Sequence, residues 1–380
     1  MKDCFIEINT NILKENIKNI IEKYDNYKYY IGVVKGNAYG HGLDIVKYIT
    51  QFGINYLAVS TLDEALYVRK LVDTPILCLQ PIAIDNLDIA SKNNITITLS
   101  SYDYFKQIMD TNLNLKIHLK LDTGMNRLGI NKKEEVEKIY NFLINSKSLK
   151  LEGIYTHLAT LGVIDKKWDN QIEKFLYLTK DIDLNKIDII HIYSTNGLVM
   201  HPKLDFTNGV RIGILMYGMC PRQANYTGVK GKLRKLKRNY LIKKYSISKT
   251  YDTYFSNVKP CFKLISKIIE IKSVNKNEYV GYGLNFKTNG SCKIAIIPIG
   301  YADGLSLSNT GRYITINDDK YKIVGSINMK MITVLVDDKV KVGDLATIVG
   351  DDARYICNYT KTTPQNLFTR IPSNIERIYK

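Results

Sequence analysis

The chain has 380 residues, 45% hydrophobic and 24% charged, with a net charge of +17; the composition is typical of soluble globular proteins and the length predicts two domains. No apolar run approaches the roughly 18 residues that a membrane-spanning helix needs, and the first residues lack a secretory signal. The six cysteines are scattered without a CxxC pair, so we expect no metal site and no disulfide framework, in a cytoplasmic protein without a membrane partner.

The first half of the chain alternates short apolar runs with amphipathic helical patterns. In chain order, the apolar runs predict eight strands over residues 29–34, 56–60, 75–79, 95–99, 115–121, 151–157, 188–192 and 204–210. Helical patterns lie between them, at residues 42–53, 63–72 and 132–146. Strands rich in Val, Ile and Leu that alternate with helices indicate a parallel sheet. Eight such units predict a closed (β/α)8 barrel over residues 9–225.

A basic segment follows the barrel. Residues 228–249, GVKGKLRKLKRNYLIKKYSISK, concentrate the positive charge of the chain. A nucleic-acid or anionic partner is one interpretation of such a charge. The segment has no base-stacking aromatic pattern and no recognisable nucleic-acid module. We therefore interpret residues 226–257 as a solvent-exposed insertion or linker, and we do not expect a nucleic-acid partner.

The last third of the chain has a different sequence pattern. Short strand patterns separated by turn residues occur at residues 261–274, 291–300, 311–317, 320–327, 331–338 and 343–350. They predict a mainly β domain over residues 258–380. The run CFIEI at residues 4–8 precedes the barrel, and we expect it to pair with this C-terminal domain.

Active sites of such barrels form at the C-terminal ends of the strands. Lys35 follows the first predicted strand, in the stretch IGVVKGNAYGHG. Polar residues or glycines that end or follow the fifth to eighth strands are Lys120, Asp122, Thr123, Arg127, His157, Ser194, Thr195, Asn196, Arg211 and Gly213. We expect all of these residues to collect on one face of the barrel.

The loops after the seventh and eighth strands are the usual phosphate site of this architecture. Here they read STNG at 194–197 and RIGI at 211–214, which offer hydroxyl and backbone N–H groups to an anion. A phosphate site together with Lys35 suggests pyridoxal phosphate, whose aldehyde bonds to an amine. An apolar barrel mouth would lower the pKa of Lys35 and favour the nucleophilic amine.

Several motifs now resemble, in order, those of the alanine racemase family of barrel-type pyridoxal phosphate enzymes. They are VVKGNAYGHG at 33–42, KLDTGMNRLG at 120–129, GIYTHLA at 153–159, HIYSTNG at 191–197, VRIGILMYG at 210–218, VGYGLNF at 280–286, IPIGYADGL at 297–305 and GSINMKM at 325–331. The resemblance runs from Phe5 to Tyr379.

The resemblance implies a homodimer whose active sites are shared between two chains. Lys35 would hold the cofactor covalently and act as one catalytic acid/base. Tyr282, reaching in from the partner subunit, would be the other. Two such groups suit a racemase, because the α-proton leaves one face of the substrate and returns to the opposite face. His157 would hold the tyrosine hydroxyl or lie against the cofactor.

The resemblance also implies the residues that bind cofactor and substrate. Arg211 would hydrogen-bond the pyridine nitrogen and leave it unprotonated, since arginine keeps its own proton. The phosphate would be held by Tyr39, Thr195, Gly213 and Ile214, with Ser194 adjacent. Substrate would meet Arg127 through its carboxylate, with Tyr301 at the entrance and the backbone of Met329, both from the partner subunit. Lys120 matches a lysine that is often carbamylated in this family and positions the arginine.

Three positions depart from the family pattern. Lys330 stands where an aspartate is usual, Ser326 where an arginine is frequent, and Gln365 where the C-terminal region usually supplies a tyrosine. A smaller or more polar residue at the last of these positions is a feature of the vancomycin-resistance serine racemases. HIYSTNGL, at residues 191–198, is also closer to those enzymes, which carry a membrane domain that we do not expect here.

The expected activity is a pyridoxal phosphate-dependent interconversion of L- and D-alanine. One alternative is racemisation of serine or another small amino acid. A second is a paralogue that binds pyridoxal phosphate with weak or no racemase activity. A third is a barrel-type amino-acid decarboxylase, although such enzymes generally have a cysteine where this chain has Tyr282.

Overall fold

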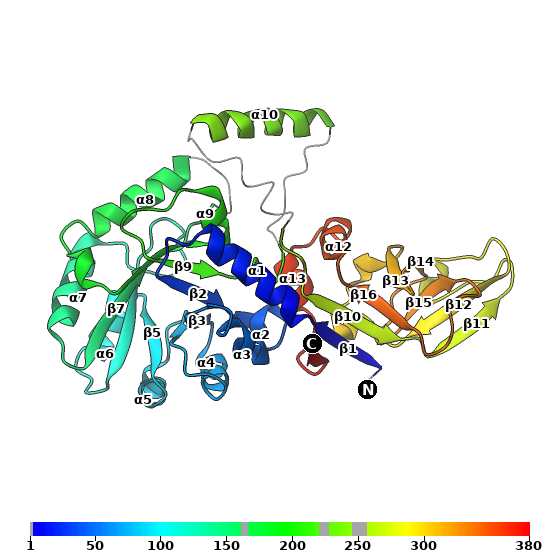
Figure 1. Ribbon diagram of the computed structural model, residues 1–380, viewed down its shortest axis with the longest axis horizontal. Helices are drawn as coiled ribbons and strands as arrows, with labels where there is room; N and C mark the ends of the chain where they lie inside the picture. The colour runs from blue at the N-terminus through cyan, green and yellow to red at the C-terminus, as the bar shows by residue number, and fades with distance from the viewer. Residues whose placement is uncertain (1–2, 161–165, 220–227, 245–256) are drawn as a thin grey trace.

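The computed structural model describes residues 3–160, 166–219, 228–244 and 257–380. A barrel lies at one end of the molecule and a β-sheet domain at the other, with helix α10 standing apart from both (Figure 1). Over the ranges just given, no helix combines the length and the apolar character that crossing a membrane requires.

The barrel is closed and consists of eight parallel strands in sequence order. Its strands are β2 (Tyr29–Val33), β3 (Tyr56–Val59), β4 (Ile76–Cys78), β5 (Ile95–Leu99), β6 (Leu115–Lys120), β7 (Leu149–Tyr155), β8 (Ile189–Ser194) and β9 (Gly209–Ile212). Residues of β3, β4 and β5 are buried throughout, which explains why these strands appear in the sequence as continuous apolar runs. The predicted barrel fold is confirmed.

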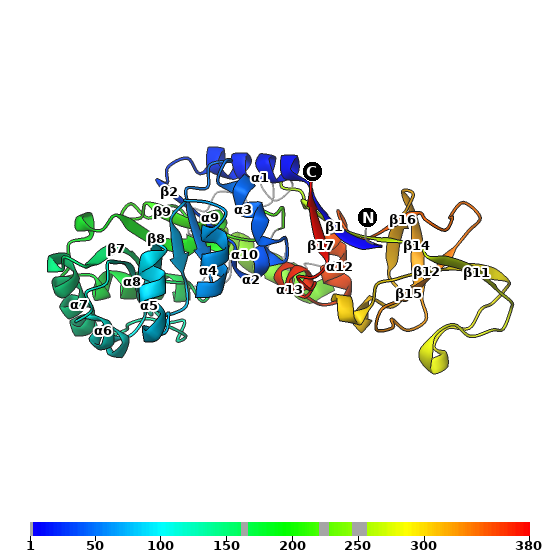
Figure 2. The same ribbon diagram turned by 90° about the horizontal axis from the view of Figure 1, so that it is seen from below.

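Helices cover the outside of the barrel, and Figure 2 shows α5 to α8 at the end far from the sheet domain. α7 illustrates the cause: its buried residues Val136, Ile139, Tyr140 and Leu143 stand at positions i, i+3, i+4 and i+7 and form one apolar face. The helices of this half are α1 (Thr10–Lys23), α2 (Lys35–Tyr39), α3 (Val46–Ile49), α4 (Leu62–Arg69), α5 (Leu87–Lys92), α6 (Tyr102–Ile108), α7 (Lys133–Asn145), α8 (Lys166–Leu178) and α9 (Thr195–Met200).

The eighth strand was predicted over residues 204–210, and most of that range is wrong. β9 begins only at Gly209. Thr207 turns the chain instead, because both its backbone N–H and its hydroxyl donate to the carbonyl of Leu204. Asn208 then accepts a hydrogen bond from the backbone N–H of Ile190 on β8. Polar turn chemistry therefore replaces the first half of the predicted strand.

The second domain is built on a nine-stranded sheet in the order β11-β12-β15-β14-β13-β16-β10-β1-β17. Its strands are β1 (Cys4–Ile8), β10 (Phe262–Lys267), β11 (Glu270–Val274), β12 (Cys292–Ile297), β13 (Tyr313–Ile316), β14 (Asp319–Val324), β15 (Ile332–Val336), β16 (Leu345–Val349) and β17 (Glu376–Tyr379). The first strand of the chain lies between β10 and the last strand, β17. Each predicted strand range of this domain overlaps a strand, whereas β17 was not predicted.

Two helices of this domain were not predicted, α12 (Ala353–Tyr359) and α13 (Pro364–Thr369). α13 had a usable signal, because the Thr363 side chain accepts from the backbone N–H of Asn366 and Pro364 occupies the first helical turn. Phe368 of α13 is fully buried. The helix contacts α2 of the barrel, and it therefore links the two domains at the barrel mouth.

The basic segment forms a helix over part of its length. α10 spans Gly228–Lys244, and residues 226–227 and 245–256 of the predicted linker lie outside the described residues. The backbone on either side of the insertion is in contact, because Cys261 N donates to Tyr217 O at 3.4 Å. The insertion therefore leaves and rejoins the body of the protein at nearly the same place.

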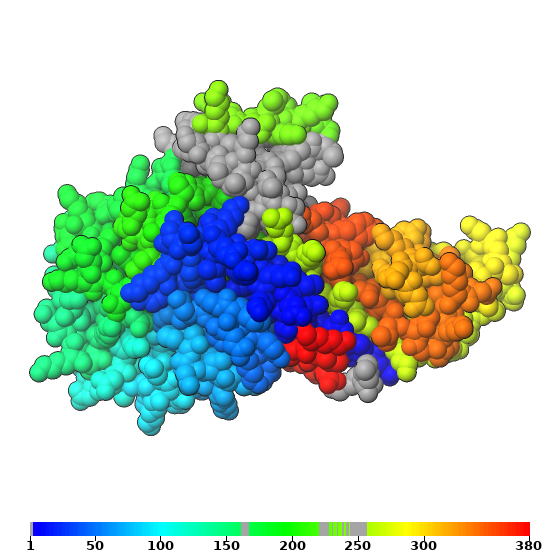
Figure 3. Space-filling model, in the orientation of Figure 1, coloured from blue at the N-terminus to red at the C-terminus, as the bar shows by residue number. Residues whose placement is uncertain are grey.

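Helix α1 lies at the junction between the barrel and the sheet domain, where it forms part of the dark blue surface in Figure 3. Asn16 of α1 is buried and donates to the carbonyls of Met216 and Lys259. Its side-chain oxygen accepts from Lys259 N at 3.1 Å. One amide side chain thus binds the end of the barrel to the start of the second domain.

Candidate active site

A cavity of about 640 Å³ opens at the C-terminal ends of the barrel strands. Ten of the predicted site residues line it: Lys35, Tyr39, Lys120, Arg127, His157, Ser194, Thr195, Arg211, Gly213 and Ile214. Asn196, also expected on this face, lines the cavity as well, whereas Asp122 and Thr123 do not. Tyr282, Tyr301 and Met329 lie on the sheet domain and do not line the cavity of their own chain.

The backbone after Lys35 forms a left-handed turn. Residues 36–39 have φ of +63°, +54°, +52° and +53°, and a left-handed conformation costs roughly 1–2 kcal/mol per non-glycine residue. Glu64 stabilises the turn, because its Oε1 accepts from the backbone N–H groups of Gly36 and Asn37 at 2.7 and 3.2 Å. Strain of this kind collects at functional sites, where surrounding structure must hold it.

The C-terminal domain closes over the same turn. A Cβ on Gly40, whose φ is +83°, would lie 2.2 Å from the carbonyl oxygen of Phe368, so only glycine allows α13 to approach. Arg377 of β17 donates to Gly40 O at 3.0 Å, and Tyr379 Oη donates to His41 O, also at 3.0 Å. The segment that follows Lys35 is therefore held by residues more than 300 positions away in sequence.

The surroundings of Lys35 lower the pKa of its amine. Burial lowers the pKa of Lys35, and the nearby charges of Arg127 and Arg211 lower it further, against a smaller opposing effect of Glu64. Lowering this pKa increases the fraction of neutral, nucleophilic amine near neutral pH. The sequence-based expectation for Lys35 agrees in direction with this result.

The corner formed by the seventh and eighth strands offers neutral donors. Gly213 N donates to Thr195 Oγ1 at 3.2 Å, and Thr195 begins helix α9. A Cβ on Gly213 would lie 2.8 Å from Tyr39 Oη. Hydroxyl and backbone N–H groups therefore converge here only because residue 213 lacks a side chain.

Arg211 lies beneath this corner and is buried. Its Nη2 donates to the carbonyls of Thr156 and Ile192 at 2.8 Å, and Nη1 donates to the carbonyl of His191 at 2.9 Å. Nη2 is also 3.2 Å from His157 Nδ1. These bonds fix the plane of the guanidinium group at the floor of the cavity.

His157 lies at the cavity wall near four basic side chains. Burial lowers its pKa to about 3, and the charges of Arg211, Arg127, Lys120 and Lys35 act in the same direction. The imidazole is therefore neutral near physiological pH. Because the guanidinium group can only donate, Nδ1 of His157 accepts and Nε2 carries the proton.

Lys120 and Arg127 also line the cavity. Burial, followed by the charges of Arg127, Arg211 and Lys35, lowers the pKa of Lys120 to about 8. Asp122 organises the loop between Lys120 and Arg127, because its Oδ1 accepts from the backbone N–H groups of residues 124, 125 and 126 at 3.0 Å.

The residues assigned to the partner site are exposed. Tyr282 is 75% exposed, Met329 59% and Tyr301 47%. Two of the departures from the family pattern support these loops. Ser326 Oγ donates to the Tyr282 carbonyl at 3.0 Å, and Lys330 Nζ lies 2.5 Å from Asp303 Oδ1, two residues after Tyr301.

Several lining residues were not singled out from the sequence. Ser60 and Gln80 follow β3 and β4, and Tyr155 ends β7, so the strand-end rule could have identified all three. Thr369 comes from α13, and no sequence signal connects it to the barrel mouth. Gln365, noted as a departure, also lines the cavity.

A barrel mouth that gathers an amine, two guanidinium groups and a neutral anion cradle, attached to a β domain, defines the class of barrel-type pyridoxal phosphate enzymes. Residues 8–221 match the family model "Alanine racemase, N-terminal domain", and residues 261–379 match "Alanine racemase, C-terminal domain". The chain belongs to the alanine racemase family, whose members are isomerases.

Individual relatives agree. The chain is 33% identical to the alanine racemase of Clostridium tetani (strain Massachusetts / E88), over 96% of this chain and 91% of the relative. The solved alanine racemase of Clostridium difficile 630 superposes with a TM-score of 0.86 at 28% identity, covering 100% of this chain and 96% of that one. A histidine racemase from Leuconostoc mesenteroides subsp. sake superposes with a TM-score of 0.84 at 25% identity, covering 100% and 98%.

Pyridoxal phosphate is the cofactor of this family, and the residues of the cavity fit it. The cavity is lined by the cations Lys35, Lys120, Arg127 and Arg211, and its described lining contains no carboxylate. Such a set requires an anionic ligand. Lys35 supplies the amine, and Gly213 leaves the space that a Cβ would occupy beside Tyr39.

Proposed function

We propose that this enzyme interconverts L- and D-alanine, with Lys35 and Tyr282 of the partner subunit as the two acid/base groups. The observation that carries the proposal is the position of Lys35 in a cationic cavity beside Arg211 and the Gly213 corner. Pyridoxal phosphate, when bound, would acidify the α-carbon hydrogen of an amino acid joined to it.

The protein's own residues would move the proton. Lys35 Nζ would take or return it on one face of the substrate, and the Tyr282 hydroxyl of the partner subunit would do so on the other. His157 carries its proton on Nε2 when Nδ1 accepts from Arg211, and it would donate this hydrogen bond to the tyrosine oxygen. Arg127 would pair with the substrate carboxylate.

The homodimer is supported by the surface of the sheet domain. Tyr282 lies between Gly281 and Gly283, with φ of +77° and +73°, on an exposed turn. The exposed apolar side chains of Leu284 and Met329 belong to this turn and to the neighbouring loop. Solitary exposed apolar residues need no explanation, but several on adjoining loops indicate an interface.

Carbamylation of Lys120 is part of the proposal. Addition of carbon dioxide requires the neutral amine, and the pKa of about 8 makes this form accessible. The resulting anion would sit among Arg127, Arg211 and Lys35, which are the charges that disfavour the ammonium form. It would balance the cavity charge and position Arg127.

Serine is a second candidate substrate because of one observation. The amides of Gln365 and Gln80 and the hydroxyl of Ser60 all line the cavity. Polar groups of this kind can hydrogen-bond a substrate hydroxyl.

Chiral chromatography after incubation with L-alanine, L-serine and L-lysine separately tests the proposal. We expect D-alanine to form fastest. Release of carbon dioxide without any D-enantiomer would establish the decarboxylase alternative, and neither product with bound cofactor would establish an inactive paralogue. Tyr282→Phe should retain the yellow colour of the bound cofactor and lose most turnover.

A further inference from the structure

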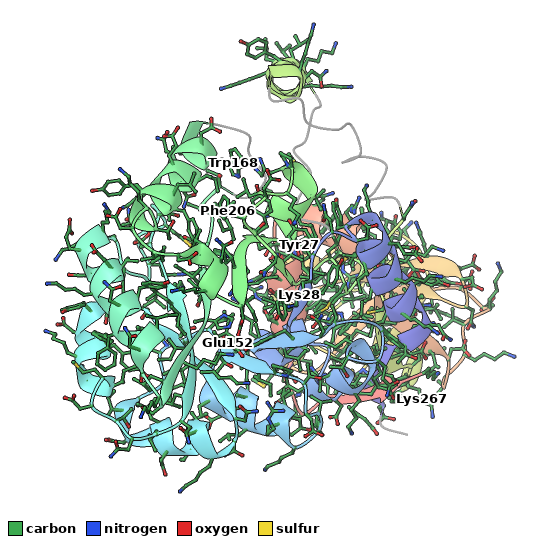
Figure 4. The ribbon with its side chains drawn as sticks, turned by 60° about the vertical axis from the view of Figure 1, so that its left-hand side comes forward. Tyr27, Lys28, Glu152, Trp168, Phe206 and Lys267 are labelled. Carbon is green, nitrogen blue, oxygen red and sulfur yellow. The ribbon has the colours of Figure 1, made fainter. Side chains whose placement is uncertain are left out.

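A line of polar side chains crosses the interior of the barrel below the active site. His118 on β6 and His191 on β8 are fully buried, and Glu152 on β7 is 7% exposed (Figure 4, where Glu152 is labelled). Barrel interiors are normally filled by branched apolar residues. Buried polar groups are retained at a cost, so each of these three requires an explanation.

These side chains form one continuous chain of hydrogen bonds that starts at Arg211. Arg211 Nη1 lies 2.6 Å from His191 Nδ1. His191 Nε2 lies 2.9 Å from His118 Nδ1, and His118 Nε2 lies 3.3 Å from Glu152 Oε2. The carboxylate is also contacted by Tyr56 Oη at 2.6 Å and by Lys116 Nζ at 3.5 Å.

The donor at each link is fixed by elementary chemistry. A guanidinium group only donates, so His191 Nδ1 must accept and Nε2 must carry the proton. That proton points to His118 Nδ1, which therefore accepts, and the proton of His118 stands on Nε2 toward Glu152. The chain runs in one direction, from the cation of Arg211 to the anion of Glu152.

The charge states agree with this order. Burial lowers the pKa of both imidazoles, and for His191 the charge of Arg211 adds to the effect. For Glu152 burial opposes ionisation, but hydrogen bonds from His118 and Tyr56 and the charge of Lys116 lower the pKa of its carboxyl below the usual value. Two neutral imidazoles thus connect two opposite charges.

The backbone of β6 and β7 makes room for this chain of hydrogen bonds. The β6–β7 register shifts between Ile117 and His118, which leaves Glu152 as the extra residue of a bulge. The next residue is Gly153, where a Cβ would lie 2.7 Å from the ring of His118. A bulge and a glycine therefore make room for the histidine and turn the carboxylate toward it.

This chain of hydrogen bonds determines which N–H group of Arg211 remains available to a ligand. Its two Nη atoms bond to carbonyls and imidazole nitrogens, and among the described residues its Nε–H meets no acceptor. We propose that Glu152, His118 and His191 are positioning residues that orient Arg211 and balance its charge, so that Nε–H faces the cofactor ring nitrogen without giving up its proton. Only the statement that Nε–H donates to the cofactor ring nitrogen rests on the proposed function.

The first test uses the cofactor-free protein. With ¹⁵N-labelled histidine, only five residues contribute, and single variants such as His201→Asn assign the signals. We expect His118 and His191 to be neutral with the proton on Nε2 near neutral pH. A proton on Nδ1 of either ring, or an imidazolium ion at either position, would overturn the proposal.

The second test is titration of the cofactor-free protein with pyridoxal phosphate, followed by absorbance. Glu152→Gln keeps the shape and removes the charge, and we expect binding to weaken on the order of tenfold. Glu152→Asp, which restores the charge, should recover part of this loss. His118→Asn should weaken binding as Glu152→Gln does.

Thr179→Val is the matched control, because Thr179 is also buried, does not line the cavity, and loses two hydrogen bonds, to Phe175 O and Leu176 O. We expect it to lower the unfolding temperature and leave cofactor affinity within about twofold. Equal weakening in Thr179→Val, or unchanged binding in Glu152→Gln, would contradict the proposal. If the wild-type protein binds no cofactor, the proposed function fails. The ¹⁵N signals of His118 and His191 still test the hydrogen-bond chain in that case.

Discussion

Glu64 holds the backbone that follows Lys35: its Oε1 lies 2.7 Å from the backbone nitrogen of Gly36. The other oxygen, Oε2, accepts from Ser60 N at 2.8 Å. One carboxylate on α4 thus connects the ends of two barrel strands and supports the left-handed turn. The lysine is positioned by a strained backbone that a neighbouring helix stabilises.

Glu64→Ala should therefore destabilise both the turn and the site. It removes an ionised acceptor from three backbone N–H groups, and we expect a loss of about 2 kcal/mol in unfolding free energy. Cofactor affinity should fall with it. Asp63→Ala, on the same helix but exposed, is the control, and denaturant unfolding is the measurement. Equal effects of the two variants would refute a specific role for Glu64.

Gly213→Ala should weaken cofactor binding on the order of tenfold, because its Cβ would lie 2.8 Å from Tyr39 Oη and displace a hydroxyl of the phosphate corner. Gly290→Ala is a matched control, since nothing lies within 4 Å of a Cβ there. Titration with pyridoxal phosphate compares the two variants. If Gly213→Ala binds like the wild type, this corner does not hold the phosphate.

The carbamate on Lys120 should be visible and dependent on pH. The amine reacts only when neutral, and because its pKa is lowered to about 8, occupancy should rise as pH increases through this value. Carbon NMR of protein equilibrated with ¹³C-bicarbonate measures it. Lys120→Arg cannot form the adduct and serves as the control. A signal that persists in this variant would come from another residue.

Excision of the basic insertion should leave folding and activity intact. Tyr217 and Cys261 are hydrogen-bonded on either side of it, so a short glycine-serine linker can replace residues 221–256. We expect the unfolding temperature to stay within a few degrees, and the racemisation rate within about twofold, of the wild type. A large loss of either would show that α10 supports the body of the enzyme.

The barrel and the residues at its mouth could be predicted because they follow local rules. Continuous apolar runs mark buried parallel strands, and polar residues after them mark the C-terminal face. The start of β9 was misplaced because side chains of Thr207 and Asn208 turn the chain, which hydrophobicity does not reveal.

The chain of hydrogen bonds from Arg211 to Glu152 was not predicted, although the sequence contains a signal for it. His118, Glu152 and His191 are polar residues at buried positions of three neighbouring strands. Strand patterns do not show which interior residues meet, because the contact between His118 on β6 and Glu152 on β7 depends on a register shift at a bulge. The support of the left-handed turn by β17 is likewise a long-range contact.

The central claim is that one active site is made from two chains, and mixed dimers test it most directly. Lys35→Ala and Tyr282→Phe should each be nearly inactive alone. Co-expressed, they should recover about a quarter of wild-type racemase activity, because half of the dimers contain one intact site. Activity of the mixture no greater than that of the two separate variants would contradict the account.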